Sequence, residues 1–152
     1  MNNFAYRYGD KNDIGRGASP GNKFEPGRKP MSTMAPTIIF DKDDKLFLIT
    51  GSPGGSDIPA AILRVITGVI DFDLDIGEAT MLPRIHKDWP YTGLEHERAV
   101  SRDIVRRLKS MGHETEYETT IGSTQSIHIV DGINNGFADL RRPNAGVSVQ
   151  SN

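Results

Sequence analysis

Short apolar runs separated by polar turns predict strands in two regions of the chain. TIIF at 37–40 and LFLIT at 46–50 flank the polar turn DKDDK, which predicts a β-hairpin of two well-buried strands. Toward the C-terminus, ETEYET, STQSIHIV and FADL predict three further strands, the last two joined through the turn DGINNG.

Apolar residues at helical spacing predict helices between these regions. The first helix follows Gly55, takes Ser56 or Asp57 as its N-cap and has Pro59 in its first turn. Its expected apolar face consists of Ile58, Ile62, Val65, Ile66 and Val69. A short second helix is expected at 76–82.

The segment SRDIVRRLKSMGH, residues 101–113, predicts the clearest helix. Ser101 is its expected cap and Gly112 its C-terminal stop. Its expected buried stripe consists of Ile104, Val105 and Leu108.

The order of these elements predicts a layered α+β domain. Residues 1–30, rich in glycine and proline from Gly9 onward, predict a long loop segment. Residues 31–143 form the expected core, and residues 144–152 the expected frayed tail.

Composition narrows the class without naming a partner. The 152 residues are 36% hydrophobic and 25% charged, which is typical of a globular chain. The net charge of -2 gives no reason to expect nucleic acid or an anionic membrane as partner. The absence of cysteine excludes disulfides and a cysteine nucleophile. No apolar run reaches the roughly 18 residues of a membrane span and the start lacks a signal-peptide pattern, so we expect a soluble chain without an export signal.

Two motifs match functional patterns by letter only. GASPG, residues 17–21, fits the nucleophile pattern G-x-S-x-G, but loop flanks it and Pro20 follows Ser19, so a serine hydrolase is the most distant hypothesis. DFDLD alternates carboxylates like a calcium loop, yet Ile76 stands where glycine is required, and Asp73 or Asp75 is better explained as a helix cap. The histidines lack zinc spacing, so neither a metal nor a cofactor is expected.

Two other motifs are stronger candidates. GSPGGS, residues 51–56, places bare backbone amides at a helix N-terminus, where they could stabilise negative charge; the alternative is a tight turn without a ligand. PMSTMAPT, residues 30–37, presents the adjacent hydroxyls of Ser32 and Thr33 between two prolines, and these could bind a carboxylate; the alternative is an ordinary strand entry. GSTQS, residues 122–126, has the same ambiguity and less to recommend it.

In this order and spacing, the motifs resemble the C-terminal part of the small subunit of the γ-glutamyltransferase (γ-glutamyltranspeptidase, glutathione hydrolase) family. The segments that carry the resemblance are GRKPMSTMAPTI, LITGSPGGSDI, VIDFDLDIGEATMLPRIHKDW, MGHE, GSTQSI and ADLRRPNAG, together with the initial MNN. The resemblance implies a partial N-terminal-nucleophile hydrolase fold, an αββα sandwich, so residues 1–152 would be a single partial domain.

The resemblance also implies a mechanism and site residues. A precursor cleaves itself, and the freed N-terminal threonine attacks the γ-glutamyl amide of glutathione or a related amide, with its own α-amine as base. Gly54 and Gly55 would form the oxyanion hole, and Ser32 and Thr33 would bind the α-carboxylate. The partners would be the large subunit and the missing N-terminal part of the small subunit, in the periplasm or outside the cell.

Two departures from the family pattern keep alternatives open. The family's nucleophile lies upstream of the NN segment, so the chain from Met1 is expected to be an inactive fragment. Where the family has a glutamine and an aspartate that bind the substrate ammonium, this chain has Phe4 and Arg7, which would suit an acylase acting on a dicarboxylic acyl amide without an α-amino group. A non-catalytic binding or scaffold domain is the alternative from another class.

Overall fold

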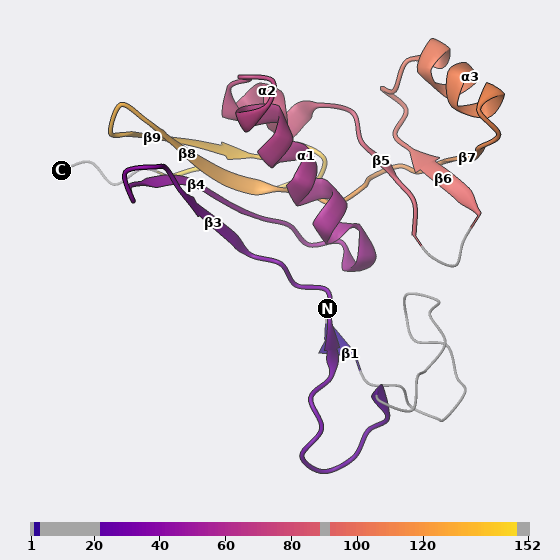
Figure 1. The fold of residues 1–152 in the computed structure, drawn as a ribbon, viewed down its shortest axis with the longest axis horizontal. Helices are drawn as coiled ribbons and strands as arrows, with labels where there is room; N and C mark the ends of the chain where they lie inside the picture. Colours follow the sequence, from indigo (N-terminus) through magenta and orange to yellow (C-terminus); the bar gives the residue numbers. More distant parts are fainter. Residues whose placement is uncertain (1, 4–21, 89–91, 149–152) are drawn as a thin grey trace.

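The computed structural model describes residues 2–3, 22–88 and 92–148, and Figure 1 shows their arrangement. The largest sheet is antiparallel throughout, in the order β3-β4-β8-β9. Its strands are β3 (Thr37–Phe40), β4 (Leu46–Gly51), β8 (Gln125–Val130) and β9 (Ile133–Ala138). At the N-terminal side, β1 (Asn2–Asn3) pairs with β2 (Met31–Ser32).

Both predicted hairpins of the large sheet are confirmed, with two differences. In β3 the side chains alternate between half-buried and exposed, and Ile38 is 59% exposed, so the prediction of two well-buried strands is wrong for this edge strand. The turn between β8 and β9 is Asp131–Gly132 rather than the whole of DGINNG, because Asp131 and Gly132 both adopt positive φ and close a two-residue loop.

Two helices cover one face of this sheet (Figure 1). They are α1 (Ile58–Ile70), which continues a short 3-10 helix η2 (Gly55–Asp57), and α2 (Ile76–Met81). The predicted face of α1 packs onto the sheet, and the core formed there contains Leu48, Val65, Val69, Ile76 and Ala79.

The two helices begin differently. Asp57, one of the two predicted candidates, is the N-cap of α1, but its side chain accepts no capping hydrogen bond. The predicted cap of α2 by Asp75 is confirmed. The Asp75 carboxylate accepts a hydrogen bond from the Glu78 N–H, and the Glu78 carboxylate accepts one from the Asp75 N–H.

A second, smaller sheet begins after α2 along the chain and includes two strands that the sequence pattern did not predict. Its order is β5 (Ile85–His86), β6 (Gly93–His96) and β7 (Glu114–Tyr117), with β6 and β7 parallel and joined through α3 (Arg102–Ser110). Ser101 caps α3 and Gly112 follows its end with φ +92°, as predicted.

The expected buried stripe of α3 is wrong. None of the residues of α3 is buried, and Ile104 is 51% exposed. The helix contacts β7, and Val105 and Leu108 are half-buried there. None of the helices in the described ranges is long and apolar enough to cross a membrane.

Candidate functional site

The site is built around the glycine turn that joins β4 to the helix formed by η2 and α1. Gly54 has φ +143° and Gly55 has φ +64°, and residues other than glycine rarely adopt these backbone angles. The first N–H groups of a helix have no partner within the helix and carry the positive end of its dipole. The backbone amides of this turn therefore lie at the positive end of the helix dipole, where negative charge is favoured.

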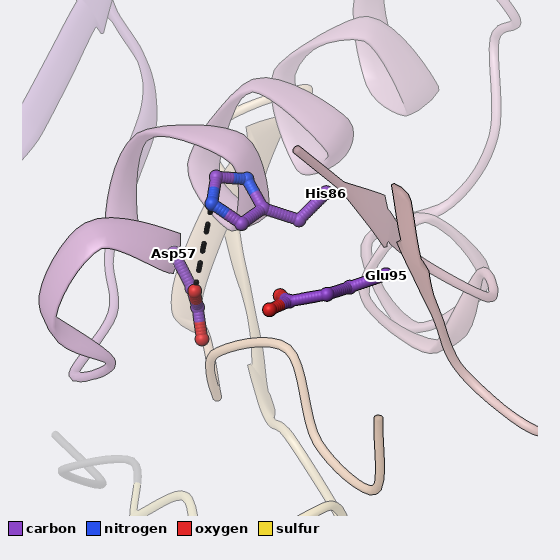
Figure 2. Close-up of side chains that lie close together, drawn as sticks. All are labelled: Asp57, His86 and Glu95. Atoms are coloured by element: carbon purple, nitrogen blue, oxygen red, sulfur yellow. Dashed lines mark ion pairs between the residues drawn. The ribbon is translucent and has the colours of Figure 1, made fainter. Parts of the chain in front are cut away.

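Three ionisable side chains lie close together near the start of α1 (Figure 2). Asp57 is the last residue of η2, and His86 and Glu95 are paired across β5 and β6. One potential ligand atom from each lies within 4.8 Å of the others, and the Asp57 Oδ1 and His86 Nε2 atoms are 3.7 Å apart. Burial raises the pKa of both carboxyl groups above the ordinary value, and each carboxylate's negative neighbours add to the effect.

The segment that follows β7 lies against the glycine turn. The Ser123 N–H donates a hydrogen bond of 2.9 Å to Ser52 Oγ, and a Cβ atom at Gly54 would lie 3.2 Å from the Gly122 Cα atom. Gly122 has φ +67°, and a Cβ there would lie 2.6 Å from that of Ala61. GSTQS, the weakest candidate among these sequence motifs, thus contacts the turn directly.

Hydroxyl groups also fix the base of the turn. Thr50 Oγ1 and Ser126 Oγ form a buried hydrogen bond of 2.8 Å between β4 and β8. The Ser52 hydroxyl donates to the Pro53 carbonyl oxygen at 2.7 Å. Together with the Ser123 contact, these bonds fix the end of β4 against the start of β8.

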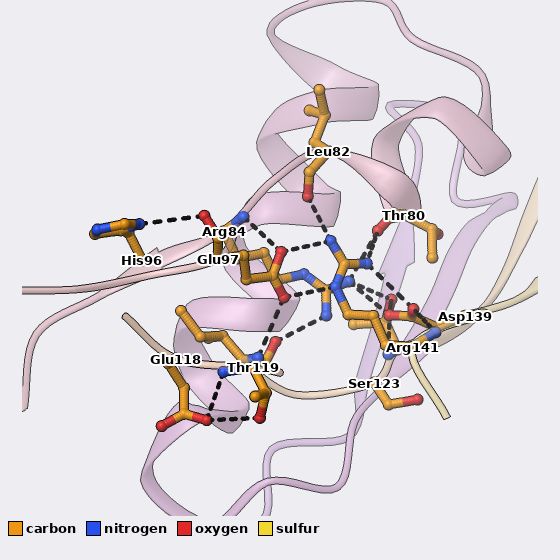
Figure 3. Close-up of polar contacts among 12 residues, drawn as sticks. Thr80, Leu82, Arg84, His96, Glu97, Glu118, Thr119, Ser123, Asp139 and Arg141 are labelled. Carbon is orange, nitrogen blue, oxygen red and sulfur yellow. Dashed lines mark hydrogen bonds and ion pairs between the residues drawn. The ribbon is translucent and has the colours of Figure 1, made fainter. Parts of the chain in front are cut away.

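A buried ion-pair network holds the supporting segment in place (Figure 3). Arg84 and Asp139 form an ion pair of 2.8 Å, with side chains 1% and 0% exposed. Arg84 also donates to the Ile121 carbonyl oxygen and to Thr124 Oγ1, while Asp139 accepts from the Thr124 N–H. The residues on both sides of Gly122 and Ser123 are therefore bonded to this pair.

Arg141 and Glu97 complete the network. Arg141 donates to both carboxylate oxygens of Glu97 and to Asp139 Oδ1. Glu97 also accepts from the backbone N–H groups of Arg84 and Ile121.

The network keeps its carboxylates ionised. Burial alone would raise the pKa of Asp139, but hydrogen bonds from backbone N–H groups and the charges of Arg84 and Arg141 hold it below the ordinary value. Burial alone would raise the pKa of Glu97 as well. The hydrogen bonds from Arg141, Arg84 and Ile121 outweigh burial and lower this pKa below the ordinary value.

Ser32 and Thr33 lie before β3, on the chain that enters the large sheet at the end where the glycine turn leaves it. Thr37 at the start of β3 pairs with Thr50 near the end of β4, so the residues before Thr37 and after Thr50 extend from one end of the sheet. Ser32 Oγ accepts a hydrogen bond from the Met34 N–H, whereas Thr33 Oγ1 is buried and has no partner among the described residues. Ser19, Phe4 and Arg7 lie outside the described residues.

Comparison with known proteins agrees with this architecture. The chain matches the family model Gamma-glutamyltranspeptidase over residues 1–149. It is 37% identical over 142 residues to the glutathione hydrolase proenzyme of Escherichia coli, covering 93% of this chain and 24% of that protein. It is 36% identical to the Bacillus subtilis glutathione hydrolase proenzyme, covering 87% of this chain and 23% of that protein.

A solved structure has the same fold. A threonine-to-alanine mutant of Helicobacter pylori γ-glutamyltranspeptidase superposes with a TM-score of 0.85 at 33% identity, covering 91% of this chain and 77% of that one. The large sheet with its helical layer is thus part of an N-terminal-nucleophile hydrolase fold, as the resemblance implied. The chain spans about a quarter of the length of the curated relatives it matches, and it belongs to the γ-glutamyltranspeptidase family.

Proposed function

We propose that this chain is the C-terminal part of the small subunit of an enzyme that transfers or hydrolyses γ-glutamyl groups of glutathione or related amides. The observation that carries the proposal is the pair of positive-φ glycines at a helix N-terminus. They follow β4 at the end of the large sheet where the chain from Ser32 and Thr33 enters β3.

In the proposed reaction the amides of Gly54 and Gly55 stabilise the oxyanion of the tetrahedral intermediate. Such donors act best when they are already oriented, because no reorganisation is then needed as charge develops. The contacts of Ser52 with Ser123 and of Gly54 with Gly122 support this role, since they hold the turn in one shape. The nucleophilic threonine would come from a part of the enzyme outside these residues.

Ser32 and Thr33 would hold the α-carboxylate of the γ-glutamyl group. The buried hydroxyl of Thr33 has no hydrogen-bond partner in the described part of the chain, which supports this role, because a buried hydroxyl without a hydrogen bond is costly unless a ligand completes it. A hydrogen bond to a charged group contributes about 1.5–3 kcal/mol, which corresponds to roughly tenfold or more in affinity.

Further parts of the enzyme would cover the open face of the large sheet. The strand register places three isoleucines on the face that points away from α1: Ile38, Ile49 and Ile127. The side chains of Ile38 and Ile127 are 59% and 39% exposed. In an αββα sandwich a second sheet packs on this face. We therefore propose the large subunit and the remainder of the small subunit as partners, with residues 31–143 as the core of one partial domain. From the family resemblance we also propose a periplasmic or secreted location.

The proposal is tested on the purified protein in its full natural length. We expect hydrolysis of γ-glutamyl-p-nitroanilide, with KM raised about tenfold in Ser32→Ala or Thr33→Val and kcat changed much less, because the hydroxyls bind substrate and transition state alike. Ser110→Ala, at the exposed end of α3, is the matched control and should behave as wild type. Unchanged KM in both variants would refute the assignment of the hydroxyl pair.

The acylase alternative rests on Phe4 and Arg7, which stand where the family is expected to have a glutamine and an aspartate that bind the substrate ammonium. It predicts faster hydrolysis of glutaryl-p-nitroanilide than of the γ-glutamyl compound. A clear preference for the γ-glutamyl donor contradicts it, and no turnover of either compound favours a non-catalytic binding or scaffold role.

A further inference from the structure

We propose that Asp57, His86 and Glu95 bind a divalent transition metal ion, for which Zn²⁺ suits the three donors best. This site does not depend on the proposed acyl transfer. The sequence did not predict this site, because the three residues are far apart along the chain and come from η2, β5 and β6.

Backbone geometry brings the three donors together. His86 and Glu95 are direct partners in the antiparallel pair of β5 and β6, and side chains at such positions start about 4.5–5.5 Å apart on the same face. Asp57 faces them from the start of α1 (Figure 2). Donors around a tetrahedral Zn²⁺ with bonds of about 2.1 Å lie roughly 3.4 Å apart. The separations here, within 4.8 Å, need a small convergence that side-chain rotation of Glu95 can supply.

The imidazole of His86 points into the cluster (Figure 2). Its side chain is 10% exposed, and Nε2 is buried without a hydrogen-bond partner among the described residues. The 3.7 Å separation from Asp57 Oδ1 is too long for a hydrogen bond. A buried imidazole nitrogen that lies near two carboxylates without a hydrogen bond to the described residues is an arrangement that a metal ion completes.

The electrostatics of the cluster favour a cation. Burial opposes the charged forms of Asp57 and Glu95 and raises the pKa of each carboxyl. Glu118 adds to the negative field at both groups, Asp88 at Asp57 and Glu116 at Glu95, and the one imidazole only partly offsets this. A dication would neutralise this excess and keep both carboxylates ionised.

The donor set selects the class of ion. One imidazole nitrogen with two carboxylates suits Zn²⁺ and similar transition metals. Ca²⁺ takes six to eight oxygen ligands and Mg²⁺ prefers an octahedron of oxygens with several waters, so neither ion matches this site. Three protein ligands would leave one position of a tetrahedron for water.

The test is equilibrium dialysis of the EDTA-treated, full-length protein against Zn²⁺, with bound metal measured by inductively coupled plasma mass spectrometry. We expect a saturable site dependent on these ligands, with affinity at least about tenfold weaker in His86→Asn and in Glu95→Gln. His113→Asn is the matched control, because His113 belongs to no such three-ligand cluster in the described ranges, and it should bind as wild type.

Each outcome decides the proposal. Loss of binding in both ligand variants, with far-UV circular dichroism unchanged and the control intact, supports the site. Absence of saturable binding in the wild type, undiminished affinity in His86→Asn, or displacement of Zn²⁺ by an equal concentration of Mg²⁺ would overturn it. If His86→Asn fails to fold, Glu95→Gln at a partly exposed position decides the question alone.

Discussion

Replacing Asp139 with asparagine should destabilise the protein strongly, because it removes the carboxylate that is paired with the buried Arg84 guanidinium. The Arg84 and Asp139 side chains are 1% and 0% exposed and 2.8 Å apart. Unit charges about 4 Å apart attract each other by about 4 kcal/mol at an effective dielectric constant of about 20. Removing one partner of a buried pair typically costs about 3–5 kcal/mol. Asp139→Asn should therefore lose about that much of the free energy of unfolding.

The assay is urea unfolding followed by far-UV circular dichroism, with wild type and variants measured under identical conditions. Arg106→Gln is the control, because Arg106 forms an ion pair with Asp103 in which both side chains are about 80% exposed. It should cost less than about 1 kcal/mol, as exposed pairs do. A loss below about 1 kcal/mol for Asp139→Asn, or one equal to that of the control, would refute the reasoning.

Two further predictions concern the same framework. Gly122→Ala should lower the free energy of unfolding, measured with urea, by much more than Gly132→Ala does. Both glycines have positive φ, but a Cβ at Gly122 would lie 2.6 Å from the Ala61 Cβ, whereas a Cβ at Gly132 would have nothing within 4 Å. Equal losses would contradict the close packing of the supporting segment. Because the pKa of folded Asp139 is lowered, its contribution is present above the unfolded value of about 3.9 and is lost as pH falls through the folded value. Urea midpoints should thus fall less steeply below about pH 4 in Asp139→Asn than in wild type, and parallel acid profiles would contradict the linkage.

Sequence patterns predicted the elements that local residues determine. The hairpin at 37–50 follows from two apolar runs around a polar turn, and the buried face of α1 follows from its spacing. The amphipathic pattern of α3 was equally clear, but such a pattern defines a face and not what covers it, so the expected burial of Ile104 was wrong.

Long-range pairing explains what the sequence could not predict. Strand β5 has two residues, too few for a periodic signal, and its pairing with β6 alone brings His86 beside Glu95. Arg84 and Asp139 are 55 positions apart, and nothing local marks them as partners. The glycine turn was recognised from its letters, while its support by Gly122 required the fold.

The most direct test of the proposed site is a crystal structure of the full-length protein after reaction with a γ-glutamyl analogue that forms a covalent adduct. We expect the oxygen of the reacted acyl group to lie about 2.7–3.1 Å from the backbone nitrogens of Gly54 and Gly55. The α-carboxylate should lie within hydrogen-bond distance of Ser32 Oγ or Thr33 Oγ1. An adduct oxygen that contacts neither glycine, or a protein that forms no adduct, would contradict the account.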